Sequence, residues 1–358
     1  MPLIQTIPEF IDQFPAKVKL LIENLDFSDT KLQMVKNKVS GDIDAQVKGF
    51  HYLLDYYHAR EPKIISYFQE HIKIGQDKST ASNILENKFT INLVTDQVPI
   101  NDGGSLDWNW LGPHQDKEWG WGLNRHFFMN TLLNTWYDTG DDIYLQKLNW
   151  LIQDWIVTNP RPSSMEHSAP WRALETALRL IYAWPRVFYR VPMGEIFFPA
   201  TKLLMLSSIW EQADYINRFH VPSGNILIME LVALLVVSAF FPEFKMAKPT
   251  LMDYTYFNNW ILNGTPQPES CLSWPDYALK RLQGQILEVQ VYPDGVQKEL
   301  TQHYHQVVAN MAEIILATME AMDITPHSRF TTRVKSMWDY LAWTMRPNGK
   351  SLLNNDSD

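Results

Sequence analysis

The stretch LNRHFFMNTLLNTWYDTGDDIYLQKLNWLIQDW, residues 123–155, decides the fold class of this chain. Its apolar residues recur every three or four positions in two series, which predicts two amphipathic helices. The first series is Leu123, Phe127, Phe128, Leu132 and Trp136, and the second is Tyr144, Leu148, Leu151, Ile152 and Trp155. Thr139-Gly-Asp between them is typical of a glycine C-cap followed by an aspartate N-cap. The stretch therefore predicts a helical hairpin with a short connection.

The same helical spacing continues along the chain, whereas the alternation typical of strands is almost absent. It recurs in the segments 174–182, 203–209, 226–240, 305–322 and 329–344. Helical pairs that repeat every 45 to 50 residues or so each need neighbours to bury their apolar faces. We therefore predict an all-α fold, an incomplete (α/α) toroid of helical hairpins.

The two ends of the chain differ from this repeat. Residues 1–100 are more polar and contain helices, one of them around Val47 to Tyr57, and then an extended segment at 89–94. We expect 1–100 to form a mostly helical region packed on a toroid domain of residues 101–345. Several prolines between 242 and 275 predict a loop-rich insert.

Composition indicates a folded globular protein and limits its partners. The 358 residues are 46% hydrophobic and 13% aromatic, enough for a large core. The formal charge of −9 argues against a nucleic-acid partner but still allows an anionic glycan in a locally basic cleft. The lone Cys271 excludes an internal disulfide framework and indicates ordinary packing. The apolar run 226–241 is interrupted by Glu230 and too short for a membrane span, so it predicts a buried helix.

The segment DGVQKELTQHYH, residues 294–305, joins an Asp-Gly turn to the start of a predicted helix. Glu299, Tyr304 and the neighbouring histidines His303 and His305 would lie in or just before its opening turns. A phenol near a loop can donate or accept a proton, although most tyrosines only pack. The segment is therefore a candidate for acid–base chemistry.

Two further motifs accompany this segment, WGWGLNRH at 119–126 and SGNILIME at 223–230. Together, in this order and on a helical background, they resemble the heparinase II/III family of polysaccharide lyases. The resemblance runs from about Trp108 to the C-terminus and includes matches at 139–142, 155–160 and 171–179. It implies a periplasmic or secreted lyase with no cofactor, in which residues 346–358 are a linker toward a C-terminal β-sandwich domain that is missing here. It also implies that this chain lacks its leader, since Met1 begins no signal sequence.

The resemblance assigns roles to two residues. Tyr304 matches the catalytic tyrosine, which protonates the leaving oxygen and can also serve as base. Asn225 matches the asparagine that neutralises the carboxylate of a uronate during β-elimination. The alternative for Asn225 is a structural N-cap of helix 226–240, a position that Asn favours.

Further residues are expected to contact the substrate or to orient those two. These residues are Arg125, His126, Trp119, Trp121, Glu230, Glu299 and His305. An arginine can bind a carboxylate or sulfate with two parallel hydrogen bonds, but a structural salt bridge competes for Arg125. Trp108 and Trp110 are further stacking candidates, although most of the 14 tryptophans must belong to the core. No ligand spacing on a helix indicates a metal.

One departure narrows the resemblance. Several branches of the family, among them alginate lyases, carry His directly after the Asn, whereas this chain has Ile226. The resemblance therefore favours the heparinase III-like branch, acting on heparan sulfate or a similar glycosaminoglycan, in which a histidine of the second domain assists. Without that domain we expect these 358 residues to bind acidic glycan weakly and to cleave it poorly.

Three other functions stay open. One is a lyase for alginate or another uronate polymer. Another is a glycan-binding module without catalysis. The third is a toroid glycoside hydrolase, which would need two carboxylates about 6.5–9.5 Å apart if inverting. Its candidate carboxylates are Asp107, Glu118, Asp294 and Glu299.

Overall fold

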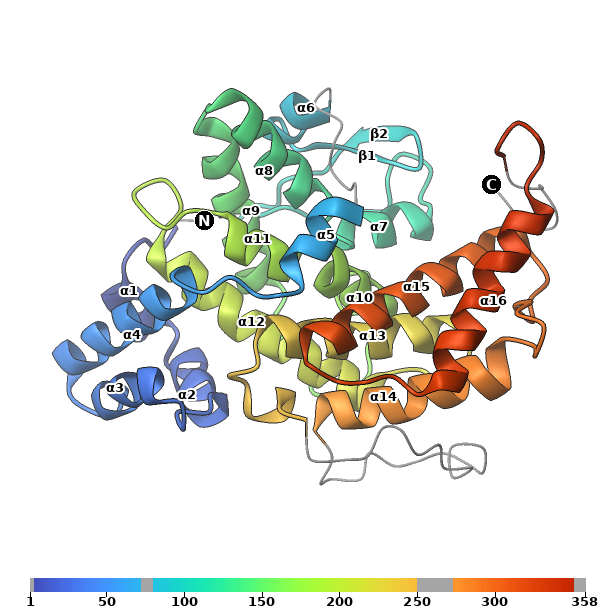
Figure 1. Cartoon of the computed structure of the whole chain (residues 1–358). Helices are drawn as coiled ribbons and strands as arrows, with labels where there is room; N and C mark the ends of the chain where they lie inside the picture. The colour runs from blue at the N-terminus through green and yellow to red at the C-terminus, as the bar shows by residue number, and fades with distance from the viewer. Residues whose placement is uncertain (1–2, 72–79, 250–272, 351–358) are drawn as a thin grey trace. The chain divides into compact units, whose positions relative to one another are not determined.

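The computed structural model describes residues 3–71, 80–249 and 273–350. Figure 1 shows that helices dominate the described chain. The first half contains α1 (Ile7–Gln13), α2 (Pro15–Asn24), α3 (Thr30–Val39), α4 (Ile43–His58), α5 (Ile65–His71), α6 (Ala81–Leu85), β1 (Lys88–Ile91), β2 (Val94–Gln97), α7 (Lys117–Asn124), α8 (Phe128–Thr139), α9 (Ile143–Thr158) and α10 (Ala173–Tyr182). The second half contains α11 (Trp184–Arg190), α12 (Pro199–Phe219), α13 (Asn225–Phe240), η2 (Lys245–Ala247), α14 (Trp274–Gly284), η4 (Gln285–Gln290), α15 (Gln302–Ala321) and α16 (Ser328–Thr344). The predicted all-α class is confirmed, whereas closure into a ring stays a prediction.

The chain divides into two compact units. Unit 1 comprises Met1–Tyr215 with Glu243–Lys245, and unit 2 comprises Ile216–Pro242 with Met246–Asp358. This division does not coincide with the sequence-based boundary at residue 100, which stays a prediction.

Helical pairs and one β-hairpin build unit 1. Helices α3 and α4 pack against each other, as do α8 and α9, and α6 packs on both β1 and α8. Strands β1 and β2 pair antiparallel through a two-residue turn in which Asn92 and Leu93 both have positive φ, 48° and 64°. Such a turn matches the twist of the strands, and Asn tolerates it better than Leu does. The extended segment at 89–94 is thus a hairpin.

The predicted hairpin at 123–155 is confirmed, but the prediction that its first helix begins at Leu123 is wrong. Helix α7 ends at Asn124 and α8 begins at Phe128, so Leu123 and Phe128 lie on different helices. His126 between them has φ +58°, which turns the chain sharply. Gly140 ends α8 in the left-handed conformation at φ +69°, and the Asp141 carboxylate accepts from the Ile143 N–H at 3.1 Å. The predicted glycine C-cap is therefore confirmed, whereas the predicted aspartate N-cap is wrong: the N-cap of α9 is Asp142, and its side chain makes no capping hydrogen bond.

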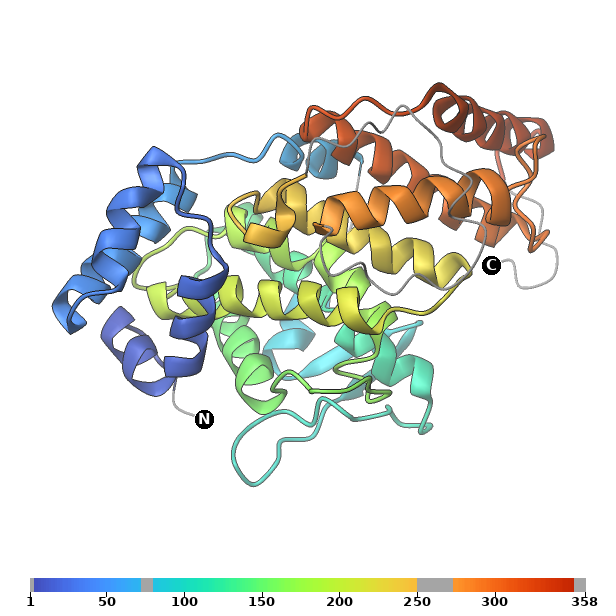
Figure 2. The same ribbon diagram turned by 90° about the horizontal axis from the view of Figure 1, so that it is seen from below.

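Helix α13 is the centre of unit 2. It packs against α14 and α15, while α16 packs on α15, an arrangement visible in Figures 1 and 2. Nearly every residue of α13 from Leu227 onward is buried, so the predicted buried helix is confirmed. The segment η4 is a π-helix that continues α14. In the described chain, no helix has both the length and the apolar composition that crossing a membrane requires.

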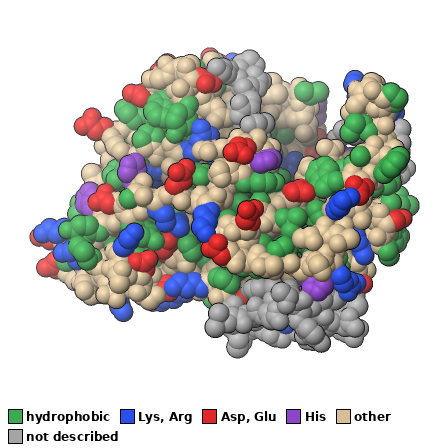
Figure 3. Space-filling view, in the orientation of Figure 1, with side chains coloured by type: hydrophobic (Ala, Val, Ile, Leu, Met, Phe, Trp, Pro, Cys, Tyr) green, Lys and Arg blue, Asp and Glu red, His purple; other side chains and the backbone are tan. Residues whose placement is uncertain are grey.

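Two predictions fall largely on residues that the structure does not describe. The loop-rich insert at 242–275 contains the short helix η2, but its residues 250–272, Cys271 among them, lie outside the described residues. The linker prediction likewise concerns residues of which 351–358 are not described. On the face in Figure 3, basic and acidic side chains of the described residues are interspersed. That face therefore shows no large field of one sign.

Candidate functional site

Asn225 is the first residue of α13, and its side chain is not used as a cap. The N-cap is Gly224, at φ +97°, and the helix start has no side-chain cap hydrogen bond. The structural alternative for Asn225 is therefore wrong. A glycine fits this position because φ near +97° is strained for other residues. The half-buried amide of Asn225 remains available for other contacts at a helix N-terminus, where the backbone dipole favours an anion.

The loop that leads to Asn225 is held by three side chains. Glu230 Oε2 accepts from the Val221 N–H at 2.7 Å, and Arg281 Nη2 donates to the Pro222 carbonyl at 3.0 Å. His220 Nδ1 contacts the Val221 carbonyl at 3.0 Å. A carbonyl only accepts, so this nitrogen carries the proton. Glu230 is fully buried, so its predicted contact with substrate is wrong. Its hydrogen bond to the loop before Asn225 accords with the other expectation, that it orients Asn225, and this role stays a prediction.

Glu299 meets the Asn225 amide. Asn225 Nδ2 donates to Glu299 Oε2 at 3.4 Å, a long hydrogen bond between half-buried side chains. Because a carboxylate only accepts, this contact turns the nitrogen of Asn225 toward Glu299 and leaves its second N–H for another acceptor. The predicted orienting role of Glu299 thus has a geometric basis.

Tyr304 lies in the first turn of α15, five residues after Glu299. Thr301 caps this helix, and its hydroxyl accepts from the Tyr304 N–H at 3.0 Å. The Tyr304 ring is half-buried and meets the His303 ring edge-on, with centroids 5.4 Å apart. Unit 2 therefore brings the Asn225 amide to the segment that immediately precedes the helix bearing Tyr304.

His305 is buried, and its two ring nitrogens both have backbone partners. Nδ1 accepts from the Gln297 N–H at 3.2 Å, so Nε2 carries the proton and donates to the Met337 carbonyl at 3.0 Å. Burial lowers the pKa of His305 below its usual value. The prediction that His305 contacts substrate is wrong, because its ring ties the 291–301 loop to α16.

The Asp294-Gly295 turn is pressed against α16. Gly295 has φ +95°, and a Cβ there would lie 2.4 Å from the backbone of Ser336. The Asp294 carboxylate accepts from the Val296 N–H at 3.1 Å and thereby stabilises the turn. This turn and the His305 ring together fix the loop that carries Glu299.

Unit 1 contains a separate charged cluster around Glu175. This carboxylate is fully buried, and Arg172 Nη1 contacts both of its oxygens at 2.8 Å. Arg125 Nη2 reaches it at 3.3 Å and the exposed Glu118 at 3.5 Å. The predicted structural salt bridge of Arg125 therefore exists, but about a quarter of its side chain stays exposed. Whether Arg125 meets the same substrate as Asn225 stays a prediction.

Two predicted contacts of unit 1 are wrong because their side chains are buried. His126 is 1% exposed, and its Nδ1 accepts from Trp184 Nε1 at 2.9 Å. Burial, with the nearby Arg179 charge, holds the pKa of His126 well below its usual value. Trp119 is 2% exposed and donates to the Val94 carbonyl at 3.1 Å. Both residues build the core of unit 1.

The other tryptophans of this region separate into core and surface. Trp108 is buried and donates to the buried Asp154 at 2.9 Å, while Trp110 is half-buried and donates to Asp96. Trp121 is half-buried, with the Arg172 guanidinium 3.9 Å from its ring centre. Arg172 and Glu175 were not among the predicted site residues, although their i, i+3 spacing on a helix start is typical of an ion pair.

Among the described residues, no group of three His, Cys, Asp or Glu side chains could hold a metal ion.

Two of the carboxylates proposed for a hydrolase accept hydrogen bonds from nearby backbone N–H groups. Asp107 accepts from the Asn109 N–H at 3.0 Å, as Asp294 does from Val296. Unit 2 can instead offer a bound anion two hydrogen-bond donors, the Asn225 amide and the Tyr304 phenol.

Comparison with known proteins gives a consistent result. The heparin-sulfate lyase of Pedobacter heparinus is 27% identical over 292 residues, covering 79% of this chain and 39% of the relative. The heparin-sulfate lyase of Bacteroides stercoris is 26% identical over 307 residues, covering 80% and 41%. This chain therefore spans about two fifths of the length of these curated relatives.

Solved structures share the fold. A crystal structure of heparinase III matches with a TM-score of 0.74 at 19% identity, covering 96% of this chain and 48% of that one. The heparan sulfate lyase HepC of Pedobacter heparinus matches with a TM-score of 0.66 at 21% identity, covering 93% and 49%. The Heparinase II/III N-terminus family matches residues 21–256 and 250–358. The chain therefore belongs to the Heparinase II/III N-terminus family.

Proposed function

We propose that this chain is the helical part of a polysaccharide lyase that cleaves a heparan sulfate-like, uronate-containing glycan by β-elimination. The observation that carries the proposal is the Asn225 amide. This amide does not cap α13. It donates a hydrogen bond to Glu299, which orients it next to the segment that leads to Tyr304. The names of the relatives, heparin-sulfate lyases, support the choice of glycan.

The reaction requires a donor for the uronate carboxylate. A base removes the proton from the carbon next to this carboxylate, and negative charge develops on its oxygens. The second N–H of Asn225 can stabilise that charge, and the N-terminus of α13 adds a favourable dipole. Glu299 acts through Asn225 by holding its nitrogen in place. The same carboxylate engages no proton of the glycan in this scheme.

Tyr304 supplies the proton for the second half of the reaction. The electron pair left on the deprotonated carbon forms a carbon–carbon double bond, and the glycosidic oxygen departs with a proton from the phenol. One residue can serve both proton steps when they occur on the same face of the sugar. The Thr301 cap supports this role because it fixes the backbone of Tyr304 at the helix start.

Location is part of the same proposal. The family resemblance implies an exported protein, periplasmic or secreted, that meets a polymeric glycan outside the cytoplasm. Fractionation of the source cells, followed by detection of the protein, tests this point. Recovery in the cytoplasmic fraction alone would contradict it.

Product chemistry tests the activity. The protein at its natural length is incubated with heparan sulfate, alginate and a neutral glucan, and the ultraviolet absorbance of an unsaturated uronate is followed. We expect absorbance to rise with heparan sulfate and not with the other two. New reducing ends without absorbance would mean hydrolysis, and binding without any product would mean a glycan-binding module. A rise with alginate alone would assign the chain to another branch of uronate lyases.

A further inference from the structure

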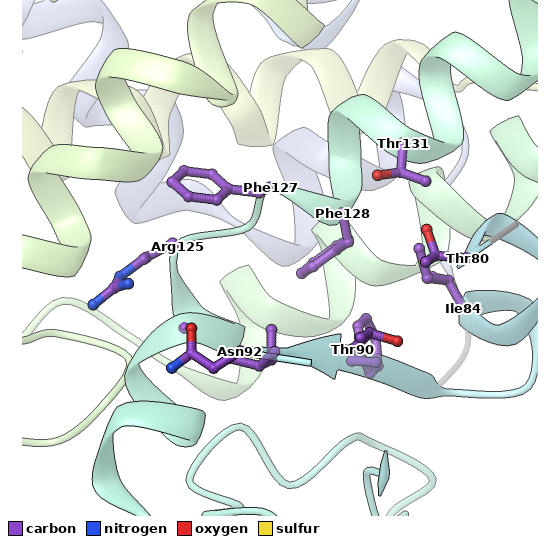
Figure 4. Close-up of a pocket in the computed structure, with 11 residues that line it drawn as sticks. Thr80, Ile84, Thr90, Asn92, Arg125, Phe127, Phe128 and Thr131 are labelled. Carbon is purple, nitrogen blue, oxygen red and sulfur yellow. The ribbon is translucent and has the colours of Figure 1, made fainter. Parts of the chain in front are cut away.

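A pocket of about 230 Å³ lies in unit 1 among the β1–β2 hairpin, α6, and the segment from α7 to α8. Figure 4 shows Phe127 and Phe128 along one side and Asn92 and Thr90 of the hairpin along the opposite side. Arg125 borders one end. The pocket is thus formed by residues of unit 1 alone, and it includes neither Asn225 nor Tyr304.

Two unusual backbone features create this pocket. His126 has φ +58°, so the chain turns between α7 and α8, and Arg125 and Phe127 on either side of the turn both line the cavity. At Gly122 a Cβ would lie 2.3 Å from Ile91 Cγ2, so only glycine lets the hairpin approach α7 this closely. Strained backbone such as that at His126, held in place by its surroundings, is typical of binding sites.

The walls of the pocket combine apolar and polar groups. Phe128 packs edge-on against the buried Phe89, with centroids 5.1 Å apart, which keeps its ring in place. Thr131 on α8 adds a hydroxyl, and Asn92 adds an amide. An apolar face opposite hydroxyl and amide groups matches a pyranose ring, which presents C–H groups on its faces and hydroxyls at its edge.

Arg125 gives this pocket a preference for an anion. Glu175 is shared between Arg125 and Arg172, so these three residues together carry one net positive charge. Glu118 reaches Arg125 only at 3.5 Å and is 54% exposed, so water screens it. Arg125 Nε is buried and has no hydrogen-bond partner among the described residues. A guanidinium held on one side by a buried carboxylate can still bind a sulfate or carboxylate on the other.

We propose that this pocket binds one anionic sugar residue, sulfated or uronic, with Arg125 receiving its anionic group. A volume near 230 Å³ is below the roughly 300–1,000 Å³ of pockets for drug-sized ligands, and it suits a single sugar ring. The proposal rests on the proposed function for the choice of a sugar. It goes beyond that function by assigning a second binding site, built from other residues than Asn225 and Tyr304.

Direct titration of the protein with monosaccharides tests the pocket without any turnover. The probes are N-sulfoglucosamine, glucuronate, the neutral N-acetylglucosamine and inorganic sulfate, each followed by ligand-observed NMR and calorimetry. Arg125→Gln removes the cation, and Thr131→Leu fills the cavity without removing any side-chain hydrogen bond that the structure shows. Arg190→Gln is the matched control, because Arg190 is a half-buried arginine of unit 1 outside the pocket.

We expect an anionic sugar to bind more tightly than the neutral sugar and than sulfate. Arg125→Gln and Thr131→Leu should each weaken it about tenfold or more, since a charge-assisted hydrogen bond or the space for the ring is lost. Arg190→Gln should leave it unchanged. Thermal unfolding of each variant checks that it is folded, and a crystal soaked with N-sulfoglucosamine provides a second measurement should Thr131→Leu fail to fold.

Unchanged affinity in both pocket variants, or sulfate binding as tightly as the sugars, would overturn the proposal. The two proposals fail separately. If monosaccharide binding responds to Arg125→Gln but the protein gives no unsaturated product, the proposed pocket is supported and the proposed lyase activity is contradicted. If the protein gives unsaturated product but sugar binding does not respond to the pocket variants, the lyase activity is supported and the pocket is contradicted.

Discussion

Asn225 Nδ2 donates to Glu299 Oε2 at 3.4 Å and thereby joins the start of α13 to the segment that precedes α15. The two residues are 74 positions apart in the sequence, so only the fold brings them together. The contact explains how a neutral amide can keep a fixed orientation on a half-buried surface. It also makes the orientation of Asn225 depend on a carboxylate that need not touch the glycan.

Glu299→Gln tests this dependence. The substitution keeps the shape but removes the charge, so the Asn225 amide can rotate and point its oxygen toward the uronate. We expect the rate of elimination to fall about 10- to 100-fold, since hydrogen bonds to charged groups contribute about 1.5–3 kcal/mol. The rate constant should fall more than the affinity for the glycan. Steady-state kinetics by ultraviolet absorbance checks the split.

The matched control for Glu299 is Glu320→Gln, an exposed glutamate at the far end of α15. It changes the net charge by the same amount without a contact to Asn225. Equal effects of the two substitutions would mean that Glu299 acts only through net charge. That result would remove the orienting role.

His305→Ala should destabilise unit 2 without removing a group that touches substrate. It leaves the Gln297 N–H and the Met337 carbonyl without their present partner, at a cost of about 1–3 kcal/mol for each buried polar group. Chemical denaturation checks the free energy of unfolding. The exposed His51 serves as control, and its replacement by Ala should leave that free energy unchanged. A stable His305→Ala protein with lost glycan binding would instead restore His305 as a substrate contact.

Gly295→Ala should be among the most damaging single changes in the 291–301 loop. The new Cβ would lie 2.4 Å from the Ser336 backbone at φ +95°, so both backbone strain and a clash act together. Strain of this kind costs of order 1–3 kcal/mol before the clash is counted. Gly194→Ala is the control, because a Cβ there meets nothing within 4 Å. Similar melting temperatures for the two variants would show that the turn yields easily.

The buried His126 should make the folded protein less stable in acid. Its folded pKa lies well below about 6.5, so above pH 6.5 both the folded and the unfolded states are neutral and its contribution is fully present. As pH falls below 6.5 the unfolded state binds a proton first, and the free energy of unfolding decreases by at most about 1.4 kcal/mol per pH unit. Denaturant unfolding at pH 7.5 and 5.5 measures this slope.

His126→Asn isolates this effect from the other titrating groups. Asparagine accepts positive φ well, can accept from Trp184 and does not titrate in this range. The variant should therefore lose less stability between pH 7.5 and 5.5 than the wild type. Identical losses would assign the acid sensitivity to other residues.

The sequence predicted many of the longer helices because their apolar spacing depends only on local residues. Helices α9, α13, α15 and α16 coincide with predicted segments, and Gly140 ends α8 as its conformational freedom indicates. The break between α7 and α8 was not predicted, because the apolar spacing continues across it. Only the left-handed backbone at His126 reveals that the chain turns there.

The sequence could name candidate site residues, but it could not predict the contacts that their side chains make. His126, His305 and Glu230 stand in the motifs that carry the family resemblance, yet all three are buried and bind the protein itself. A sequence gives the position of a side chain on its own helix but not the partner that covers it. For the same reason the pairing of Asn225 with Glu299 emerged only from the structure.

The most direct test of the account is the release of unsaturated uronate from heparan sulfate by the protein at its natural length, compared with Tyr304→Phe. Phenylalanine keeps the packing of the half-buried ring and removes only the proton. We expect absorbance with the wild type and a loss of about 10²–10⁴ in rate with Tyr304→Phe, at nearly unchanged glycan affinity. Elimination at a near-normal rate by Tyr304→Phe, or cleavage that yields no absorbance, would contradict it.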